Sequence, residues 1–361
     1  QSRSSAASDV YKRQPLVYVD FTAADNTVLI DQEVRFTKVK GSGSFVNRIS
    51  DDPVIAAGED RRNLKLTVEE LHSEYLGASV YFKNSTFKST PEVPTALDFQ
   101  LHASGQLDDL NKILGNENFF FVGGKFEAQL TMNGPAGKLA DVLKNTEGRL
   151  TMHNTKVHYL PAEVTVPLTE LDVLLSPEQA TVPSIRIPLA EGQEIKISGV
   201  VKNFSSLIFE DKKEKVESNL AMYSAELNLD HFLELIASFQ DASATDATQA
   251  RISETVKGIY TTFQPRLRVL IDQFVYQKWQ ARDIQSQLSF INDHQIKLDT
   301  TILFSGQSQL VLNGTFDVPD STQYLKMNME VEATATPKIS TRRFLTIPFS
   351  SRMETISFRE K

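Results

Sequence analysis

Residues 97–104 read LDFQLHAS, a run in which apolar and polar side chains alternate at every position. Successive side chains of a β-strand point to opposite sides of the sheet, so this alternation predicts a strand with one apolar face and one hydrated face. The same period of two recurs at 64–68, 126–132, 195–197, 298–304 and 325–331. We therefore predict one-faced antiparallel strands, because the strands of a parallel sheet are buried on both faces and form continuous apolar runs.

Glycine-bearing segments are predicted to mark the breaks between these strands, because glycine supplies the backbone freedom that turns and bulges need. They are Gly41-Ser42-Gly43, Asn133-Gly134-Pro135, Ser198-Gly199 and Asn313-Gly314. Two apolar stripes with helical spacing predict short helices that interrupt the sheet. The stripes consist of Phe232, Leu235, Ile236 and Phe239, and of Ile252, Val256, Ile259 and Tyr260.

A weak internal repeat suggests how the sheet is extended. A strand that runs into a short leucine-bearing segment recurs at 104–114, 136–145 and 227–236. A repeat unit that cannot bury its apolar face alone must pack against its neighbours. The predicted fold class is thus mainly β: an elongated, curled antiparallel sheet with a few short helices.

The composition excludes some classes of function. The chain has 361 residues, of which 40% are hydrophobic and 23% charged, as in ordinary folded proteins. Its formal net charge of -8 argues against a general nucleic-acid binder, which needs clustered Lys and Arg to neutralise phosphates. The absence of cysteine excludes disulfides and thiolate chemistry.

The sequence contains no recognisable catalytic, metal or cofactor motif. Its six histidines form no HExxH pair, and no GxSxG, Walker or GxGxxG segment occurs. The acidic pair Asp108-Asp109 is predicted to lie at a helix start or in a turn. The aromatic group at Phe274, Tyr276 and Trp279 is interpreted as a packed sheet face rather than a ligand cluster. We accordingly expect a protein that is not an enzyme, with no cofactor and no metal.

The apolar side of such a series of strands must be covered by something. Two solutions are open at this point. The strands could form a sandwich in which two sheets pack on each other and no ligand exists. Alternatively, a curled sheet could hold lipid chains on an apolar concave face. A lipid-processing enzyme, built from side chains of distant strands, is the third and least supported reading.

Three stretches resemble the AsmA family of envelope proteins. They are TEGRLTMHNTKVHYLP (Thr146–Pro161), ELNLDHFLELI (Glu226–Ile236), and the segment RLRVLIDQFVYQKWQARDIQSQLSFINDHQIKLDTTILFSGQSQLVLNGTFDV (Arg266–Val318). The last is similar to the C-terminal region of that family, where alternating strands close on Gly and then on Asn-Gly. The resemblance covers residues 96–333 and depends on the order of diffuse motifs.

The resemblance implies a periplasmic protein held in the inner membrane by an N-terminal anchor that is missing here. Its curled sheet would form a β-groove that moves phospholipid between the inner and outer membranes, or supports outer-membrane biogenesis. The expected partners are thus phospholipid, or another acyl-chain lipid, and the membrane, with no nucleic acid. A structural or interaction β-sandwich module with no lipid ligand stays as the alternative.

The residues expected to line the apolar concave face come from the alternating strands. They are Leu97, Phe99, Leu101, Phe126, Leu130, Met132, Ile302, Phe304, Leu310, Leu312, Met327 and Met329.

The chain is expected to divide into four segments. Residues 1–14 lack apolar periodicity and end in DVYKRQ, which resembles translated adapter DNA, so we interpret them as non-native. Residues 15–95 form an N-terminal β segment, and residues 96–333 the AsmA-like region. In residues 334–361 the alternation stops, and the segment contains six basic and two acidic residues. We interpret this tail as a frameshifted or truncated end, with a membrane-binding basic tail as the alternative.

Overall fold

The computed structural model describes the larger part of the chain. The described backbone comprises residues 16–30, 34–49, 64–90, 95–114, 119–135, 142, 144–160, 164–177, 179–189, 192–207, 215–232, 263–292, 295–317, 325–335 and 339–349. Side chains at 30, 34, 114, 164, 207, 263–264, 316–317, 325–329, 335 and 339–349 are not described. The predicted non-native segment 1–14 and the second helical stripe, at 252–260, lie outside the described residues.

The chain divides into two compact units. The first contains residues 1–115, 125–151 and 174–178, and the second contains 116–124, 152–173 and 179–361. These units are defined by contacts, whereas the predicted segments 15–95 and 96–333 mark the extent of a resemblance, so the two divisions describe different properties.

The first unit is one antiparallel sheet with a short helix. Neighbouring strands pair in chain order, and β5 pairs with β7. The elements are β1 (Tyr18–Ile30), β2 (Val34–Val46), β3 (Leu64–Tyr75), β4 (Ala78–Ser89), β5 (Ala96–Gln106), α3 (Leu107–Leu114), β7 (Lys125–Pro135) and the start of β8 (Thr146–Tyr159). Helix α3 begins where β5 ends and packs against it.

The second unit contains β6, the remainder of β8, all but the last two residues of β9, and the strands that follow. These are β6 (Phe119–Val122), β9 (Val164–Leu175), β10 (Gln179–Pro188), β11 (Glu194–Lys202), β12 (Val216–Asn228), β13 (Phe263–Tyr276), β14 (Trp279–Asn292), β15 (Gln295–Ser305), β16 (Ser308–Asp317), β17 (Leu325–Ala335) and β18 (Ile339–Phe349), with the 3-10 helix η3 (Phe204–Leu207). Segment 334–361, which we interpreted as a frameshifted or truncated end, thus includes β18, which pairs antiparallel with β17.

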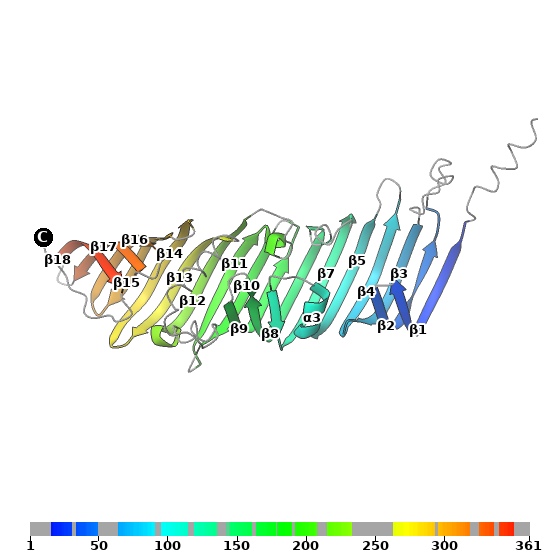
Figure 1. The fold of residues 1–361 in the computed structure, drawn as a ribbon, viewed down its shortest axis with the longest axis horizontal. Helices are drawn as coiled ribbons and strands as arrows, with labels where there is room; N and C mark the ends of the chain where they lie inside the picture. Colours follow the sequence, from blue (N-terminus) through cyan, green and yellow to red (C-terminus); the bar gives the residue numbers. More distant parts are fainter. Residues whose placement is uncertain are drawn as a thin grey trace, which may run out of the picture. The chain divides into compact units, whose positions relative to one another are not determined.

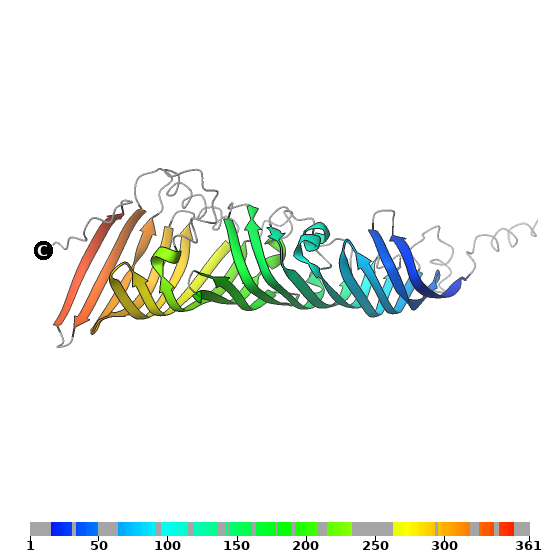
Figure 2. The same cartoon turned by 90° about the horizontal axis from the view of Figure 1, so that it is seen from below.

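The strands of each unit lie side by side in an open, curled sheet (Figures 1 and 2). The predicted fold class, mainly β with a curled, mostly antiparallel sheet and few short helices, is confirmed. One pair departs from the antiparallel pattern, because β12 and β13 run parallel. A parallel pair needs a long crossover connection, and residues 229–262 between the two strands supply it.

Bulges inside the strands explain why the sheets curl. Asp25, Lys38 and Asn84 have φ of 67°, 52° and 47°, and each lies at a shift of the strand register. Asp283 repeats this arrangement in the second unit, with φ of 53°. A bulge adds one residue to one strand of a pair, which bends that strand and increases its twist.

The predicted breaks are wrong at Gly41-Ser42-Gly43, Ser198-Gly199 and Asn313-Gly314, which lie inside β2, β11 and β16. Asn133-Gly134-Pro135 forms the end of β7, where the strand stops as predicted, and the β2–β3 register shifts at Ser42 and Gly43. At Gly41, a Cβ would collide with the carbonyl oxygen of Glu70 on β3, so glycine permits close approach of the strands rather than a turn. A tight hairpin turn instead lies at Leu76-Gly77, where both residues have positive φ (50° and 98°).

Only some of the residues in the predicted helices are described by the structure. Asp108 and Asp109 lie in the first turn of α3, which confirms the predicted helix start. A helical turn begins after β12, where the Asn228 side-chain oxygen accepts a 2.9 Å hydrogen bond from the Asp230 amide. That contact satisfies one of the free N–H groups at a helix start. Of the first predicted stripe, only Phe232 is described.

Candidate functional site

The first unit carries the predicted apolar residues of β5 and β7 on one face. Leu101 lies directly opposite Phe82 of β4 on one side and Leu130 of β7 on the other. Phe99 lies opposite Met132 in the same register. Residues that face each other in an antiparallel pair project to the same side of the sheet. The structure therefore brings these side chains together, as the alternation predicted.

Aromatic rings extend this face across four strands. The ring centroids of Phe36 and Phe82 are 6.4 Å apart, and those of Phe82 and Phe99 are 6.0 Å apart. Tyr75 lies 5.1 Å from Phe36. Such edge-to-face and tilted contacts are favourable for aromatic pairs. An uninterrupted aromatic row thus connects β2, β3, β4 and β5 in the first unit.

Burial along this apolar face is uneven. Phe126 and Met132 are 4% and 1% exposed, whereas Leu97, Phe99, Leu101 and Leu130 are only partly buried. Near the end of β5, Leu107 and Leu110 of α3 are buried, so the helix covers that part of the face. The side chains in between remain accessible among the described residues, unlike those of a close-packed core.

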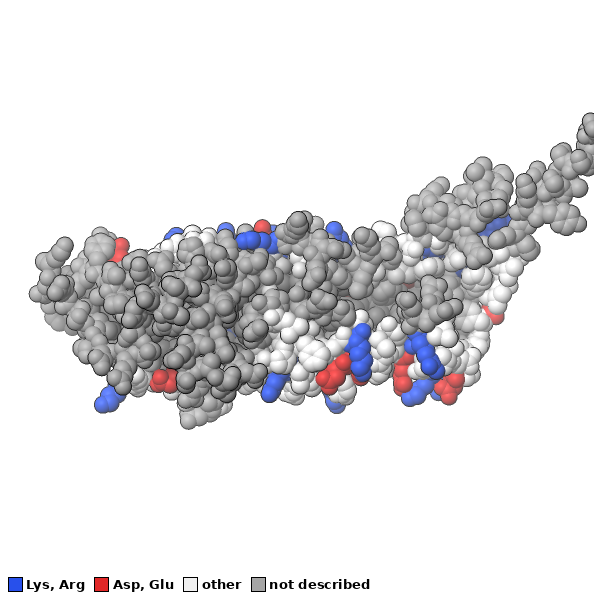
Figure 3. Space-filling view, viewed as in Figure 1, with Lys and Arg blue, Asp and Glu red and all other residues white. Residues whose placement is uncertain are grey.

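The opposite face of the first unit is polar. Lys38 pairs with Glu74 at 2.7 Å, and the hydrogen bond from the ammonium to this carboxylate raises the pKa of Lys38 above its ordinary value. His102 lies 3.1 Å from Glu127 on the neighbouring strand. The opposite face of the first unit is therefore a hydrated surface of mixed charge. On the side of the molecule seen in Figure 3, basic and acidic side chains likewise lie next to one another on the described surface.

The second unit has a larger apolar cluster. Its buried members come from β11 to β15, and partly buried side chains, including Phe232 of the helical turn after β12, pack around them. The buried members are Ile195, Leu227, Val269, Ile271, Ala281, Ile284 and Leu303. Leu310 and Leu312, both predicted, pack against this cluster. The sequence prediction missed the buried members, although alternation at 195–197 already placed Ile195 on an apolar face.

Two of the predicted residues lie on the other side of this sheet. Leu303 faces Leu310, whereas its neighbour Phe304 faces Gln309 and Ile302 faces Val311. The prediction that Ile302 and Phe304 share a face with Leu310 and Leu312 is therefore wrong. The physical reason is a register shift between Leu298 and Thr301, because one extra residue inverts the side-chain phase of a strand.

The last two predicted residues can be located only by their backbone. Met327 and Met329 lie in β17, opposite Phe316 and Gly314 of β16. Their side chains are not described. Whether any of the twelve predicted residues contacts lipid stays a prediction.

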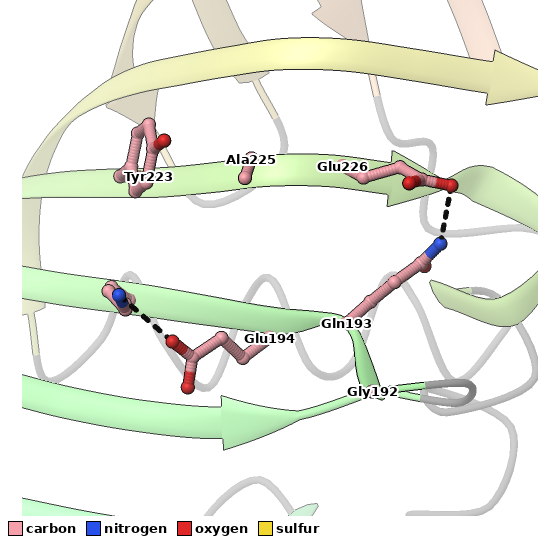
Figure 4. A pocket seen from close by; sticks show the side chains of 7 residues that line it. Gly192, Gln193, Glu194, Tyr223, Ala225 and Glu226 are labelled. Carbon is pink, nitrogen blue, oxygen red and sulfur yellow. Dashed lines mark hydrogen bonds and ion pairs between the residues drawn. The ribbon is translucent and has the colours of Figure 1, made fainter.

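A hollow on the second unit has a different chemistry. Gly192, Gln193, Glu194, Lys196, Tyr223, Ala225 and Glu226 line it, as Figure 4 shows. Gln193 donates a 2.8 Å hydrogen bond to Glu226, and Lys196 pairs with Glu194 at 2.9 Å. The polar side chains that line the hollow thus bond to one another, and the hollow offers no concentrated charge.

Tyr223, at the border of this hollow, donates a 2.7 Å hydrogen bond to the Asp272 carboxylate. This bond raises the pKa of the Tyr223 phenol above 10.0, with smaller contributions from burial and from the negative charge of Asp272. A phenol that is held protonated is neither a nucleophile nor a base.

The described residues include no group of three or more His, Asp or Glu side chains that could hold a metal ion. Within the same part of the chain, no helix has the length and apolar character needed to cross a membrane.

No protein-family model, curated protein or solved structure matches this chain. Function is therefore inferred from the apolar faces and from the sequence pattern.

Proposed function

We propose that the chain is a non-enzymatic lipid-binding protein in which the apolar sheet faces hold the acyl chains of phospholipids. The observation that carries this proposal is the open apolar face of the first unit. There, Phe99, Leu101 and Leu130 project from one layer of strands and stay partly exposed among the described residues. Contiguous apolar surface of this kind marks an interaction site.

Chain-like ligands suit such a face better than compact ones. Its contacts come from Leu, Phe and Met side chains repeated along successive strands of the described sheet. Transfer of each methylene out of water contributes about 0.8 kcal/mol, so a two-chain lipid meets a cost of roughly 20 kcal/mol or more when it crosses water alone. A continuous apolar track would lower that barrier through many interchangeable contacts.

The resemblance to the AsmA family supports a more specific proposal. On that resemblance, the protein would act in the periplasm, anchored to the inner membrane, and would help to move phospholipid to the outer membrane. The family itself, the location and the direction of movement are all part of the proposal.

A sandwich without ligand is the competing function. It requires two sheets that pack face to face about 10 Å apart. The described ladders within each unit join neighbouring strands of one layer, which favours the lipid-binding proposal. Thr165 Oγ1 lies 2.6 Å from His158 Nδ1, but a hydroxyl–imidazole contact alone does not favour an enzyme.

Lipid extraction tests the proposal. The purified chain is extracted with organic solvent, and phospholipid is measured by mass spectrometry against an unrelated β-sandwich protein of similar size. We expect phospholipid in a defined molar ratio to the protein. Lipid at the level of the sandwich control would contradict the proposal.

A matched pair of variants locates the lipid. Leu101→Glu places a charge on the apolar face, and Gln100→Glu places the same charge on the exposed face of the same strand. Because an unpaired charge is costly among acyl chains, only Leu101→Glu should lose lipid. Unfolding curves of both variants would show whether lipid is lost without loss of the fold. Equal lipid content in the two folded variants would exclude this face as the binding site.

A further inference from the structure

The apolar cluster of the second unit reaches the surface on the side of the sheet where β10, β12 and β13 end. Leu189, Phe232 and Phe274 pack against the buried cluster. They follow the ends of β10 and β12 or lie near the end of β13. The strand registers place these strand ends on the same side of the sheet. Pro188 lies opposite Glu194, Asn228 opposite Val275, and Tyr276 opposite Trp279.

Trp279 is the outermost member of this group. It is 40% exposed, and its ring lies edge-on to Phe274 with centroids 5.7 Å apart. The registers place Trp279 on the same face as Phe274 and Ala281, which is the face of the buried cluster. Apolar surface therefore continues from the cluster, through Phe274, to the exposed indole.

The indole N–H of Trp279 is also held by a hydrogen bond. Its Nε1 donates a 3.1 Å hydrogen bond to Ser305 Oγ at the end of β15. Next to it, Gln277 donates to the Tyr276 hydroxyl at 3.4 Å. Tryptophan and tyrosine with an apolar body and a satisfied polar group prefer the interface between acyl chains and lipid headgroups. We name Leu189, Phe232, Phe274, Tyr276 and Trp279 the aromatic edge.

We infer that the aromatic edge docks on the surface of a phospholipid bilayer, with Trp279 inserted at the level of the headgroups. This inference rests on the proposed function, since it gives the apolar cluster a place where acyl chains enter or leave. Continuity between the partly buried side chains around the cluster and the exposed indole favours a membrane over a protein partner, because a lipid can move along such apolar surface without crossing water.

Charge contributes little to this docking. Around the aromatic edge, Glu226 and Asp230 are acidic and Lys278 is basic, so the described side chains form no positive field for anionic lipid. Binding should thus occur on neutral phosphatidylcholine vesicles and change little with salt, since salt weakens only the electrostatic part of binding.

The test uses intrinsic fluorescence, because Trp279 is the only tryptophan of the chain. The full chain is mixed with phosphatidylcholine vesicles, with and without brominated acyl chains, and acrylamide access is measured in parallel. We expect a blue shift of the emission, quenching by the brominated lipid and protection from acrylamide. An unchanged spectrum with no quenching by brominated lipid would overturn the inference.

Variants check that the edge provides the binding energy. Trp279→Ser should reduce the vesicle-bound fraction in sedimentation, with an apparent partition coefficient about tenfold lower because a large apolar side chain is removed. Ile291→Ser is the matched control, since Ile291 is 46% exposed near the opposite end of the same strand. Equal losses in both variants would overturn the inference. Trp279→Phe, which keeps a ring against Phe274, should bind better than Trp279→Ser.

The two proposals can fail separately. Vesicle docking reports on the aromatic edge, whereas the lipid content of the purified protein reports on the apolar faces. Lipid that co-purifies without any response of Trp279 to vesicles would overturn only the docking site.

Discussion

Leu303 of β15 lies directly opposite Leu310 of β16, whereas the next residue, Phe304, lies on the reverse side beneath the guanidinium of Arg282. The Arg282 Cζ is 5.3 Å from the Phe304 ring centroid, a distance typical of a cation–π contact. Adjacent residues of one strand therefore lie in two different environments: Leu303 in an apolar cluster, and Phe304 on an exposed charged surface.

This division predicts different effects of two truncations. Leu303→Ala should destabilise the second unit by about 2–5 kcal/mol, because it removes buried methyl groups and leaves a cavity. Phe304→Ala should cost less, since Phe304 is only partly buried and lies outside the cluster. Hydrogen exchange of the β15 and β16 amides would measure both changes locally. A larger loss of protection in Phe304→Ala would contradict the assignment of faces.

How far the sequence predicts these faces depends on the bulges. Between Ala96 and Gln106, β5 pairs with β7 in an unbroken register, so the alternation in the sequence equals the alternation in space. In β15, the extra residue between Leu298 and Thr301 inverts the phase, and Ile302 and Phe304 move to the other face. The run Ile302-Leu303-Phe304 is apolar at every position, so period alone could not identify which residue is buried.

Most of the strand breaks predicted from glycine were wrong for a related reason. Gly41 and Gly199 lie inside strands where a Cβ would meet a carbonyl oxygen of the next strand. Glycine in a sequence indicates either a turn or a close approach of two backbones, and only the pairing distinguishes the two. The cluster around Ile271 and Ile284 depends on contacts between strands, which no local pattern contains.

The glycine contact gives a second prediction. Gly41→Ala should destabilise the β2–β3 pair, because the new methyl group would collide with the backbone oxygen of Glu70. Gly306→Ala is the control, since its Cβ would meet nothing within 4 Å and only its φ of 59° is unfavourable for alanine. Thermal unfolding should show a larger decrease in stability for Gly41→Ala. A larger decrease for Gly306→Ala would contradict the close approach of β2 and β3.

A third prediction concerns bulk on the apolar face of the first unit. Leu97 is partly buried and lies opposite Phe87 and Gly134. Leu97→Trp should leave the fold intact, because an open face can accommodate the larger ring, but it should lower lipid content by obstructing the track. In a closed sandwich, the same change would overpack the core at a cost of about 1–3 kcal/mol. Thermal unfolding combined with lipid extraction distinguishes the two.

A fourth prediction concerns pH. The raised pKa of Tyr223 means that its hydrogen bond to Asp272 stabilises the fold fully below the ordinary tyrosine pKa of 10.0. This contribution is lost as the pH rises through the higher, folded-state pKa. Asp272→Asn should move the Tyr223 titration midpoint back toward 10.0, because the carboxylate acceptor and its negative charge are removed. NMR of ring-labelled tyrosine measures the midpoint, and identical midpoints in both proteins would contradict this account.

Photocrosslinking inside cells tests the central claim most directly. A photoreactive amino acid is placed at Phe99 or Leu310 on the apolar faces, and at Gln100 or Phe304 on the opposite faces as controls. The account predicts phospholipid adducts at Phe99 and Leu310 and none at the two control positions. Adducts that are absent from both apolar-face positions, or equally abundant at all four, would contradict a lipid-binding face.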